Sequence, residues 1–253
     1  LVARGMFSEE EVAEIREAFM AQAADGPVEG LSDKGRIADP NDPLWRYPRM
    51  MHPHHKPEFP RVQPIARRVL LDRRIEGVLW DLFGAEPIGA QTMFYFKPPG
   101  ARGQDIHQDN FYLRVKPGTC MAAWIAIDDA DRENGGMVVV PGTHKLDLQC
   151  PEEADSAQFF SQHHVEPPEG HAIEPVDLNA GDVLFFNGSV IHGSYPNAST
   201  DRFRRSLICH YVPAEAKEVA QFYPLYRFDG EQVQREAATG GGPCGEVEAG
   251  GGY

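Results

Sequence analysis

Two histidines and one carboxylate in this chain have the types and the spacing of a metal site. His107 and Asp109 are separated by one residue, so on an extended strand both side chains would point to the same side. His192 would arrive from a different strand and complete a three-ligand face. Two histidines and one carboxylate with open positions opposite them suit non-haem Fe(II) oxygen chemistry. A short His-x-Asp motif also occurs by chance. The surrounding sequence must therefore show whether these residues form a metal site.

Length and charge limit the possible functions. With 253 residues the chain can bury one sizeable core, and all-β proteins of this length are often single domains. The net charge of −14 argues against general binding of nucleic acid or of an anionic membrane surface. We expect a small-molecule substrate, no nucleic-acid partner and no membrane partner; a homo-oligomer is compatible with the sequence. No stretch approaches the ~18 apolar residues of a membrane span and no signal peptide is visible, which predicts a cytoplasmic protein.

The cysteines indicate the redox compartment. Four cysteines are scattered along the chain without any CxxC pair. Such scattered cysteines are typical of a reducing compartment. We therefore predict free, mostly packed thiols, without a disulfide framework or a zinc-thiolate site.

The first part of the chain is predicted to be helical, with a long irregular loop. Ser8 followed by Glu11 is a capping box ahead of an apolar helical period. Residues 61–84 are predicted to be helical, with Asp72 as a cap and Gly84 as the stop. Between them, residues 27–60 show little period, and long loops of this kind are often functional.

A histidine-rich piece lies within that loop, from Arg49 to Lys56. Its histidines, His52, His54 and His55, raise the alternative of a second metal site. Prolines flank the piece and no acidic ligand lies beside it, so a loop at the mouth of a pocket is the favoured interpretation.

From about residue 88 the period changes to that of strands. The predicted strands are 88–97, 120–128, 137–140, 182–186 and 204–212, and Gly, Pro and Asn turns separate them. This pattern predicts a mainly β protein with a double-stranded β-helix (jelly-roll or cupin-like) core and flanking N-terminal helices. We expect one domain over 1–253: helical support and a pocket loop (1–87), the core (88–213) and a C-terminal extension (214–253). The Gly-rich tail from Glu231 is compatible with a surface strap or a contact with a neighbouring subunit.

Arginines at the start of the last predicted strand indicate an anion site. Arg202, Arg204 and Arg205 precede residues that are largely apolar. An arginine that points into a barrel requires an anion, because a lone buried guanidinium is costly. A dicarboxylate such as 2-oxoglutarate provides a carboxylate that matches the guanidinium fork. Ser194, two residues after His192, would lie on the same side of a strand and add a hydroxyl donor.

With these motifs in order, the sequence resembles the phytanoyl-CoA dioxygenase (PhyH) family of Fe(II)/2-oxoglutarate-dependent oxygenases. The resemblance runs from about residue 90 to 213. It rests on Lys97-Pro98-Pro99, His107-Gln108-Asp109, Trp124, Asn134-Gly135, the run from Pro141 to Lys145, Gly181-Asp182, Phe185-Phe186, the run from Ile191 to Ser194, Asn197, and Arg204 ahead of Cys209-His210-Tyr211.

The resemblance implies roles for individual residues. Its implied iron ligands are His107, Asp109 and His192, and its implied 2-oxoglutarate contacts are Arg204, Ser194, Trp124 and Met93. The distance in sequence from His192 to Arg204 is one residue longer than the family pattern, so Arg202 and Arg205 stay open as alternatives to Arg204. His210 is expected to be packed rather than ligating. Since related halogenases lack the carboxylate ligand, Asp109 favours hydroxylation over chlorination.

The implied reaction uses Fe(II), O2 and 2-oxoglutarate, and it hydroxylates a small-molecule C–H bond while 2-oxoglutarate becomes succinate and CO2. A desaturation, epoxidation or cyclisation at the same iron is an alternative, and so is a non-catalytic cupin-like module that binds a metal or ligand. The cationic loop suggests an anionic or polar substrate. A CoA thioester stays open by family name. Candidate substrate contacts are Tyr112, Phe111, Gln104, Tyr95, Asn187, Arg49, His52 and Lys56.

Overall fold

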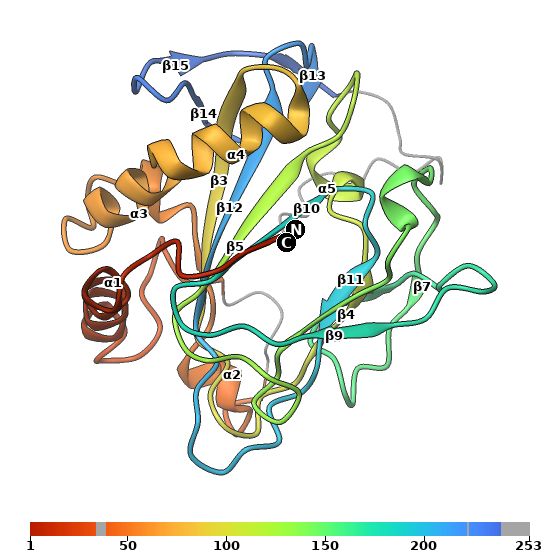
Figure 1. The fold of residues 1–253 in the computed structure, drawn as a ribbon. Coiled ribbons are helices and arrows are strands. Elements are labelled where there is room, and N and C mark those ends of the chain that lie inside the picture. The colour runs from red at the N-terminus through yellow and green to blue at the C-terminus, as the bar shows by residue number, and fades with distance from the viewer. Residues whose placement is uncertain (34–38, 222, 239–253) are drawn as a thin grey trace.

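Two sheets face each other in the computed structural model, which describes residues 1–33, 39–221 and 223–238 (Figure 1). The large sheet has the order β1-β10-β5-β12-β3-β14-β15, with β2 also paired to β3. Its strands are β1 (Val2–Ala3), β2 (Met50–Met51), β3 (Pro87–Tyr95), β5 (Met121–Ala126), β10 (Val183–Asn187), β12 (Ser206–Pro213), β14 (Leu225–Tyr226) and β15 (Gln232–Val233).

The small sheet has the order β4-β11-β6-β9. Its strands are β4 (Gln104–His107), β6 (Met137–Val139), β9 (Glu174–Val176) and β11 (His192–Ser194). All pairs in these two sheets are antiparallel. Two short pairs lie outside them, β7 (Glu152–Glu153) with β8 (His163–His164) and β13 (Glu218–Val219) with β16 (Glu236–Ala237). The fold is thus mainly β and of the cupin-like jelly-roll kind, as the strand pattern predicted.

The helices lie mostly in the first third of the chain. They are α1 (Glu9–Gln22), α2 (Pro43–Arg46), α3 (Gln63–Leu70), α4 (Arg73–Phe83) and α5 (Asn110–Leu113), with short 3-10 helices at Pro53–His55 and Thr143–Lys145. The capping box at Ser8 is present, with the Ser8 hydroxyl accepting from the Glu11 amide. Asp72 caps α4 and Gly84 ends it in the left-handed region at φ 67°. The predicted helix boundaries therefore follow from local capping chemistry.

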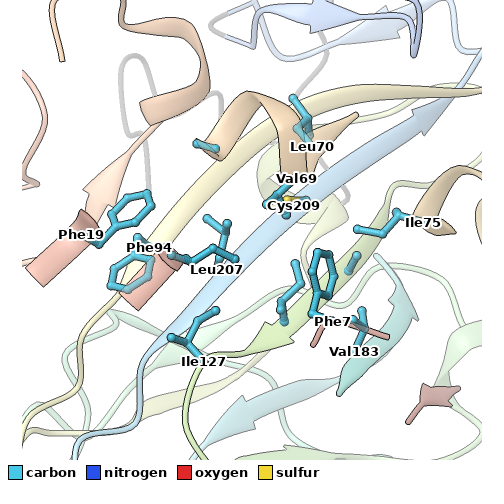
Figure 2. Close-up of a cluster of buried hydrophobic side chains, with 14 of the residues drawn as sticks. Phe7, Phe19, Val69, Leu70, Ile75, Phe94, Ile127, Val183, Leu207 and Cys209 are labelled. Atoms are coloured by element: carbon cyan, nitrogen blue, oxygen red, sulfur yellow. The ribbon is translucent and has the colours of Figure 1, made fainter. Parts of the chain in front are cut away.

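One face of the large sheet is covered by α1, α3 and α4, and we call it the helix-covered face (Figures 1 and 2). Phe19 of α1 stacks on Phe94 of β3, with ring centroids 4.1 Å apart. Leu207 and Cys209 of β12 lie in the same buried cluster. This face contains almost only apolar side chains, so its role is to hold the sheet in place.

The opposite face of the large sheet, which we call the inner face, points toward the small sheet. Trp124 of β5, Phe186 of β10 and Ile208 of β12 share a buried cluster with Met137 of the small sheet. Because the large sheet is covered on both faces, every residue of β5 is buried, which explains its continuous apolar run. The division of the chain into support, core and extension stays a prediction.

The cysteines and the Gly-rich tail were the subject of two further predictions. The prediction of free thiols is wrong for Cys150, which is disulfide-bonded, whereas Cys120 and Cys209 are free and buried. CxxC spacing detects only local pairs, and a disulfide between distant residues leaves no such signal. Residues 239–253 of the Gly-rich tail lie outside the described residues. Across the described ranges, none of the helices has the length and hydropathy needed to cross a membrane.

Candidate active site

The three predicted metal ligands come together between the two sheets. Nε2 of His107 lies 3.5 Å from Oδ1 of Asp109, and Nε2 of His192 lies 3.6 Å from Oδ2 of the same carboxylate. All three residues are buried. One ion with metal–ligand bonds of about 2.0–2.2 Å can bridge ligand atoms at this spacing. They form the one cluster of potential metal ligands found in the described part of the chain.

Asp109 reaches this cluster from a helical turn, which corrects the prediction that it shares a strand with His107. His107 is the last residue of β4, and Asp109 has helical backbone angles (φ −63°, ψ −35°) at the start of α5. The backbone amides of Tyr112 and Leu113 donate to the Asp109 carbonyl. The helical turn at Asp109 thus brings its side chain to His107, as strand alternation also would have done.

Backbone carbonyls fix the orientation of both histidine rings. Nδ1 of His107 lies 2.8 Å from the Asp105 carbonyl, and Nδ1 of His192 lies 2.9 Å from the Val190 carbonyl. A carbonyl only accepts, so each Nδ1 carries a proton and Nε2 is the nitrogen that faces the metal position. Burial lowers the pKa of His192 to about 4, which keeps that ring neutral at pH 7. The donor set therefore fits a first-row divalent ion.

His210 supports the carboxylate ligand. Its Nε2 lies 3.1 Å from Oδ2 of Asp109, and its ring is 1% exposed. Burial opposes ionisation of Asp109, but His192, His210 and His107 together hold its pKa well below the usual range. His210 is thus packed, as expected, and it is also a hydrogen-bond partner of the predicted metal ligand Asp109. The sequence did not indicate this second role.

Arg204 lies at one end of the same cavity. Its Nε donates to the Gly135 carbonyl at 3.0 Å and its Nη1 donates to the Ser206 hydroxyl at 2.8 Å. It is 2% exposed, burial lowers its pKa to about 10, and among the described residues no carboxylate pairs with it. A buried guanidinium without a protein counter-ion is a site for an anion.

The two competing arginines are already paired. Arg202 binds Asp131 and Glu133 at the surface. Arg205 binds Asp128 at 2.7 Å. Their charges are therefore balanced by protein carboxylates, and the geometry favours Arg204 as the arginine that meets an external anion.

Lys97 is a second buried basic side chain beside Arg204, and sequence reasoning gave it no role in the site. Its Nζ donates to the Ser194 hydroxyl at 2.7 Å and to the Tyr195 carbonyl at 2.6 Å. Burial, followed by the charge of Arg204, lowers its pKa well below the usual value. Gly135 makes room for it, because a Cβ there would lie 2.6 Å from Cδ of Lys97. The sequence signal for this contact was the pair of motifs Lys97-Pro98-Pro99 and Asn134-Gly135, because the glycine leaves room for the lysine side chain.

Three further residues predicted for the anion pocket line the cavity with Arg204: Met93, Trp124 and Ser194. The guanidinium carbon of Arg204 lies 5.2 Å from the centre of the Trp124 ring. The Ser194 hydroxyl accepts from Lys97, which leaves its own proton free to be donated.

The predicted substrate residues are divided among several places. Tyr95 and Gln104 line the cavity, and the edge of the Tyr112 ring meets His107 with centroids 6.1 Å apart. Phe111 packs edge-on against Tyr112 and lies outside that lining. Asn187 lies in a separate groove beside the His144 carbonyl, because strand alternation turns it away from Phe186.

The histidine-rich loop lies close to the inner face. Arg49 donates to the Tyr95 hydroxyl and pairs with Asp33 at 2.6 Å. Its charge is thus balanced, which removes the loop's main argument for an anionic substrate. Lys56 donates to the Gly30 carbonyl instead of entering the cavity.

The histidines of this loop do not converge on one point. Nδ1 of His54 meets the Thr92 hydroxyl, Nδ1 of His55 meets the Tyr226 hydroxyl, and His52 packs against Tyr223. No second metal cluster occurs within the described ranges.

Comparisons with known proteins agree with this geometry. The family model "Phytanoyl-CoA dioxygenase (PhyH)" matches residues 1–206. Phytanoyl-CoA dioxygenase 1 of Oryza sativa subsp. japonica is 28% identical over 158 residues, which are 62% of this chain and 56% of that protein. The peroxisomal phytanoyl-CoA dioxygenase of Homo sapiens is 32% identical over 142 residues, 52% of this chain and 41% of that protein. The chain thus spans about half the length of these relatives.

Solved structures show the same fold. EctD from S. alaskensis with 2-oxoglutarate and 5-hydroxyectoine has a TM-score of 0.65 at 22% identity, covering 86% of this chain and 73% of that chain. The α-ketoglutarate-dependent carbocyclase SnoK from nogalamycin biosynthesis has a TM-score of 0.64 at 24% identity, covering 86% and 80%. The family model matches most of the sequence, and the chain belongs to the phytanoyl-CoA dioxygenase (PhyH) family.

Proposed function

We propose that this chain is an Fe(II)- and 2-oxoglutarate-dependent dioxygenase that hydroxylates a C–H bond of a small molecule. In this reaction the substrate, O2 and 2-oxoglutarate give the hydroxylated product, succinate and CO2. The observation that carries the proposal is one cavity lined both by a His-Asp-His cluster and by a buried arginine that has no carboxylate partner among the described residues.

The protein's part is to bind and orient the reactants. We assign His107, Asp109 and His192 to the iron, because their ligand atoms converge and backbone carbonyls hold the Nδ1 protons of the two histidines. When bound, iron supplies the oxidising chemistry, and it uses O2 and 2-oxoglutarate to do so. Arg204 would hold the distal carboxylate of 2-oxoglutarate, with Ser194 as a hydroxyl donor and Met93 and Trp124 as walls.

A small molecule that fits this partly polar cavity is the proposed substrate. Tyr95, Gln104 and Tyr112 are the predicted substrate contacts that the geometry supports best. Arg49 supports them indirectly through its hydrogen bond to the Tyr95 hydroxyl. The cytoplasmic location stays a prediction, since the bovine and human relatives are named peroxisomal.

Succinate release tests this function. Purified protein with Fe(II), ascorbate and 2-oxoglutarate should release succinate slowly without a substrate, and faster with one. A protein that neither releases succinate nor binds 2-oxoglutarate would instead be a non-catalytic cupin-like binding module.

Product analysis separates hydroxylation from the alternative outcomes. Hydroxylation incorporates one oxygen atom from labelled O2 into the product. A product without that label would indicate desaturation or ring closure at the same site. We keep this alternative because one protein with the same fold is named as a carbocyclase.

A further inference from the structure

An irregularity in the small sheet turns Gln104 toward the metal ligands. In the pairing of β4 with β11, His107 lies opposite His192. Gln104 lies opposite Ser194, so three steps along β4 match two steps along β11. Regular alternation would put residues three apart on opposite faces, and the extra residue returns Gln104 to the face of His107. Gly193 permits this close approach, because a Cβ there would lie 2.7 Å from the Gln104 carbonyl oxygen.

The Gln104 amide contacts the nitrogen of His107 that faces the metal position. Both residues line the cavity, and Nε2 of Gln104 lies 3.1 Å from Nε2 of His107. Nδ1 of His107 donates to the Asp105 carbonyl, so in the neutral ring Nε2 carries the lone pair and accepts from the amide. A metal ion would bind through that same lone pair. The hydrogen bond from Gln104 and a metal–nitrogen bond at His107 therefore exclude each other.

The second histidine of the cluster lacks this contact. His192 is oriented by the bond from its Nδ1 to the Val190 carbonyl, and among the described residues no side-chain amide donates to its Nε2. A single bond at Nδ1 is thus enough to orient a ligand ring. The Gln104 amide must therefore have an effect at His107 other than orientation, and its position on the lone pair makes that effect a competition with the metal.

Gln104 also has space to leave the nitrogen. The residue is half-buried, and besides the cavity it lines a separate groove that Ile106 and Phe159 also line. Its side chain can therefore turn away from His107 while the backbone of β4 stays paired.

We propose that the Gln104 amide caps Nε2 of His107 in the metal-free protein and is displaced when a metal binds. The inference rests on the proposed function, since it concerns the same metal ligands. A buried acceptor without a donor costs stability, so the cap stabilises the protein before metal binds. Metal binding must break this hydrogen bond. Gln104 therefore lowers the affinity of the site for metal by the amount by which it stabilises the metal-free protein.

Thermal unfolding with and without metal tests the proposal. Gln104→Met keeps the length of the side chain and removes the amide. In the metal-free protein it should lower Tm by roughly 2–4 °C, because Nε2 of His107 loses its donor. With saturating Co(II), which takes the place of the amide, the difference from the parent protein should vanish. A difference of the same size in both states overturns the proposal.

A surface glutamine provides the matched control. The Gln158 amide donates to Asp155 at the surface, away from the metal ligands. Gln158→Met should therefore change Tm equally with and without Co(II). A metal-dependent change in this variant as large as that in Gln104→Met would contradict the assignment to Gln104.

Metal affinity gives the second readout. Calorimetric titration with Co(II) should give a Kd about 2- to 10-fold lower for Gln104→Met than for the parent protein, which corresponds to one hydrogen bond. An equal or higher Kd contradicts the proposal. A parent protein that binds no Co(II) contradicts the proposed function, and the cap with it.

The parent protein alone allows a third measurement, which does not depend on the folding of any variant. In nuclear magnetic resonance spectra of the metal-free protein, a side-chain amide proton of Gln104 should be protected from exchange with water. Addition of one equivalent of Zn(II) should abolish this protection, because the ion takes the lone pair that the amide used. Exchange that is equally slow with and without Zn(II), or equally fast, overturns the proposal.

Discussion

The two faces of the large sheet differ in whether their side chains find partners within the protein. On the helix-covered face, Phe19, Phe94 and Leu207 meet apolar neighbours on every side. On the inner face, Arg204 has no carboxylate partner among the described residues, and the His-Asp-His cluster turns three ligand atoms toward one another. The first face is complete as folded, whereas we propose that bound molecules supply the missing partners on the second. Stability and binding should therefore respond to different substitutions.

The largest effect on stability is expected on the helix-covered face. Phe19→Ala removes a fully buried ring stacked on Phe94 and should lower the free energy of unfolding by about 3–5 kcal/mol. Chemical denaturation measures this loss. The affinity for 2-oxoglutarate should be unchanged at a temperature at which the variant is folded; a weaker affinity would mean that the two faces are not independent.

The largest effect on binding is expected at Arg204. Arg204→Ala should weaken 2-oxoglutarate binding by about 2–5 kcal/mol, which is roughly 30-fold to several thousand-fold in Kd. Calorimetric titration of the metal-loaded protein measures it. Arg202→Ala, which removes a surface ion pair with Asp131, is the matched control and should bind normally. An equal loss in both variants would contradict the assignment of Arg204.

A smaller effect on binding is expected at Lys97. Lys97→Met removes the amine that donates to the Ser194 hydroxyl and should weaken 2-oxoglutarate binding by about 1 kcal/mol, the typical net contribution of one hydrogen bond. Burial lowers the pKa of Lys97, so it loses its charge as pH rises through that lowered pKa. The Kd of the parent protein should therefore increase with pH in a step that Lys97→Met lacks. If the Kd of the parent protein and that of Lys97→Met change with pH in the same way, Lys97 does not contribute to 2-oxoglutarate binding.

The smallest effect is expected at the cap of α1. Ser8→Ala removes the hydroxyl that accepts from the Glu11 amide and should cost about 1 kcal/mol of stability. Denaturation measures this change, and both the Kd for 2-oxoglutarate and the rate of succinate release should stay at parental values. A change in either would show that α1 does more than support the sheet.

Local chemistry made much of the fold predictable. The Ser8 box, the Asp72 cap and Gly84 each mark a helix end through contacts within a few residues of the cap. The strands were readable because apolar runs alternate with turn residues, as at Asn134-Gly135. The disulfide at Cys150 left no pattern, since no CxxC pair surrounds that residue. A two-residue strand such as β1 is too short to show a period.

The site was predictable where a motif carries the chemistry. His107, Asp109 and His192 meet as expected, although Asp109 arrives from a turn. Asn187 lies in another groove, because one position along a strand reverses the direction of a side chain. The environments of Lys97, His210 and Gln104 depend on pairing between distant strands, and a single sequence contains no direct record of that pairing.

The central claim is that iron and 2-oxoglutarate meet at the cluster beside Arg204. Its most direct test is the visible charge-transfer absorbance of the Fe(II)–2-oxoglutarate complex, measured without oxygen. We predict that this band appears when 2-oxoglutarate is added to the Fe(II)-loaded protein. Arg204→Ala should require higher 2-oxoglutarate concentrations for the same band, and His192→Ala should lose it. A parent protein that binds Fe(II) but shows no band, or a His192→Ala variant that keeps it in full, would contradict the account.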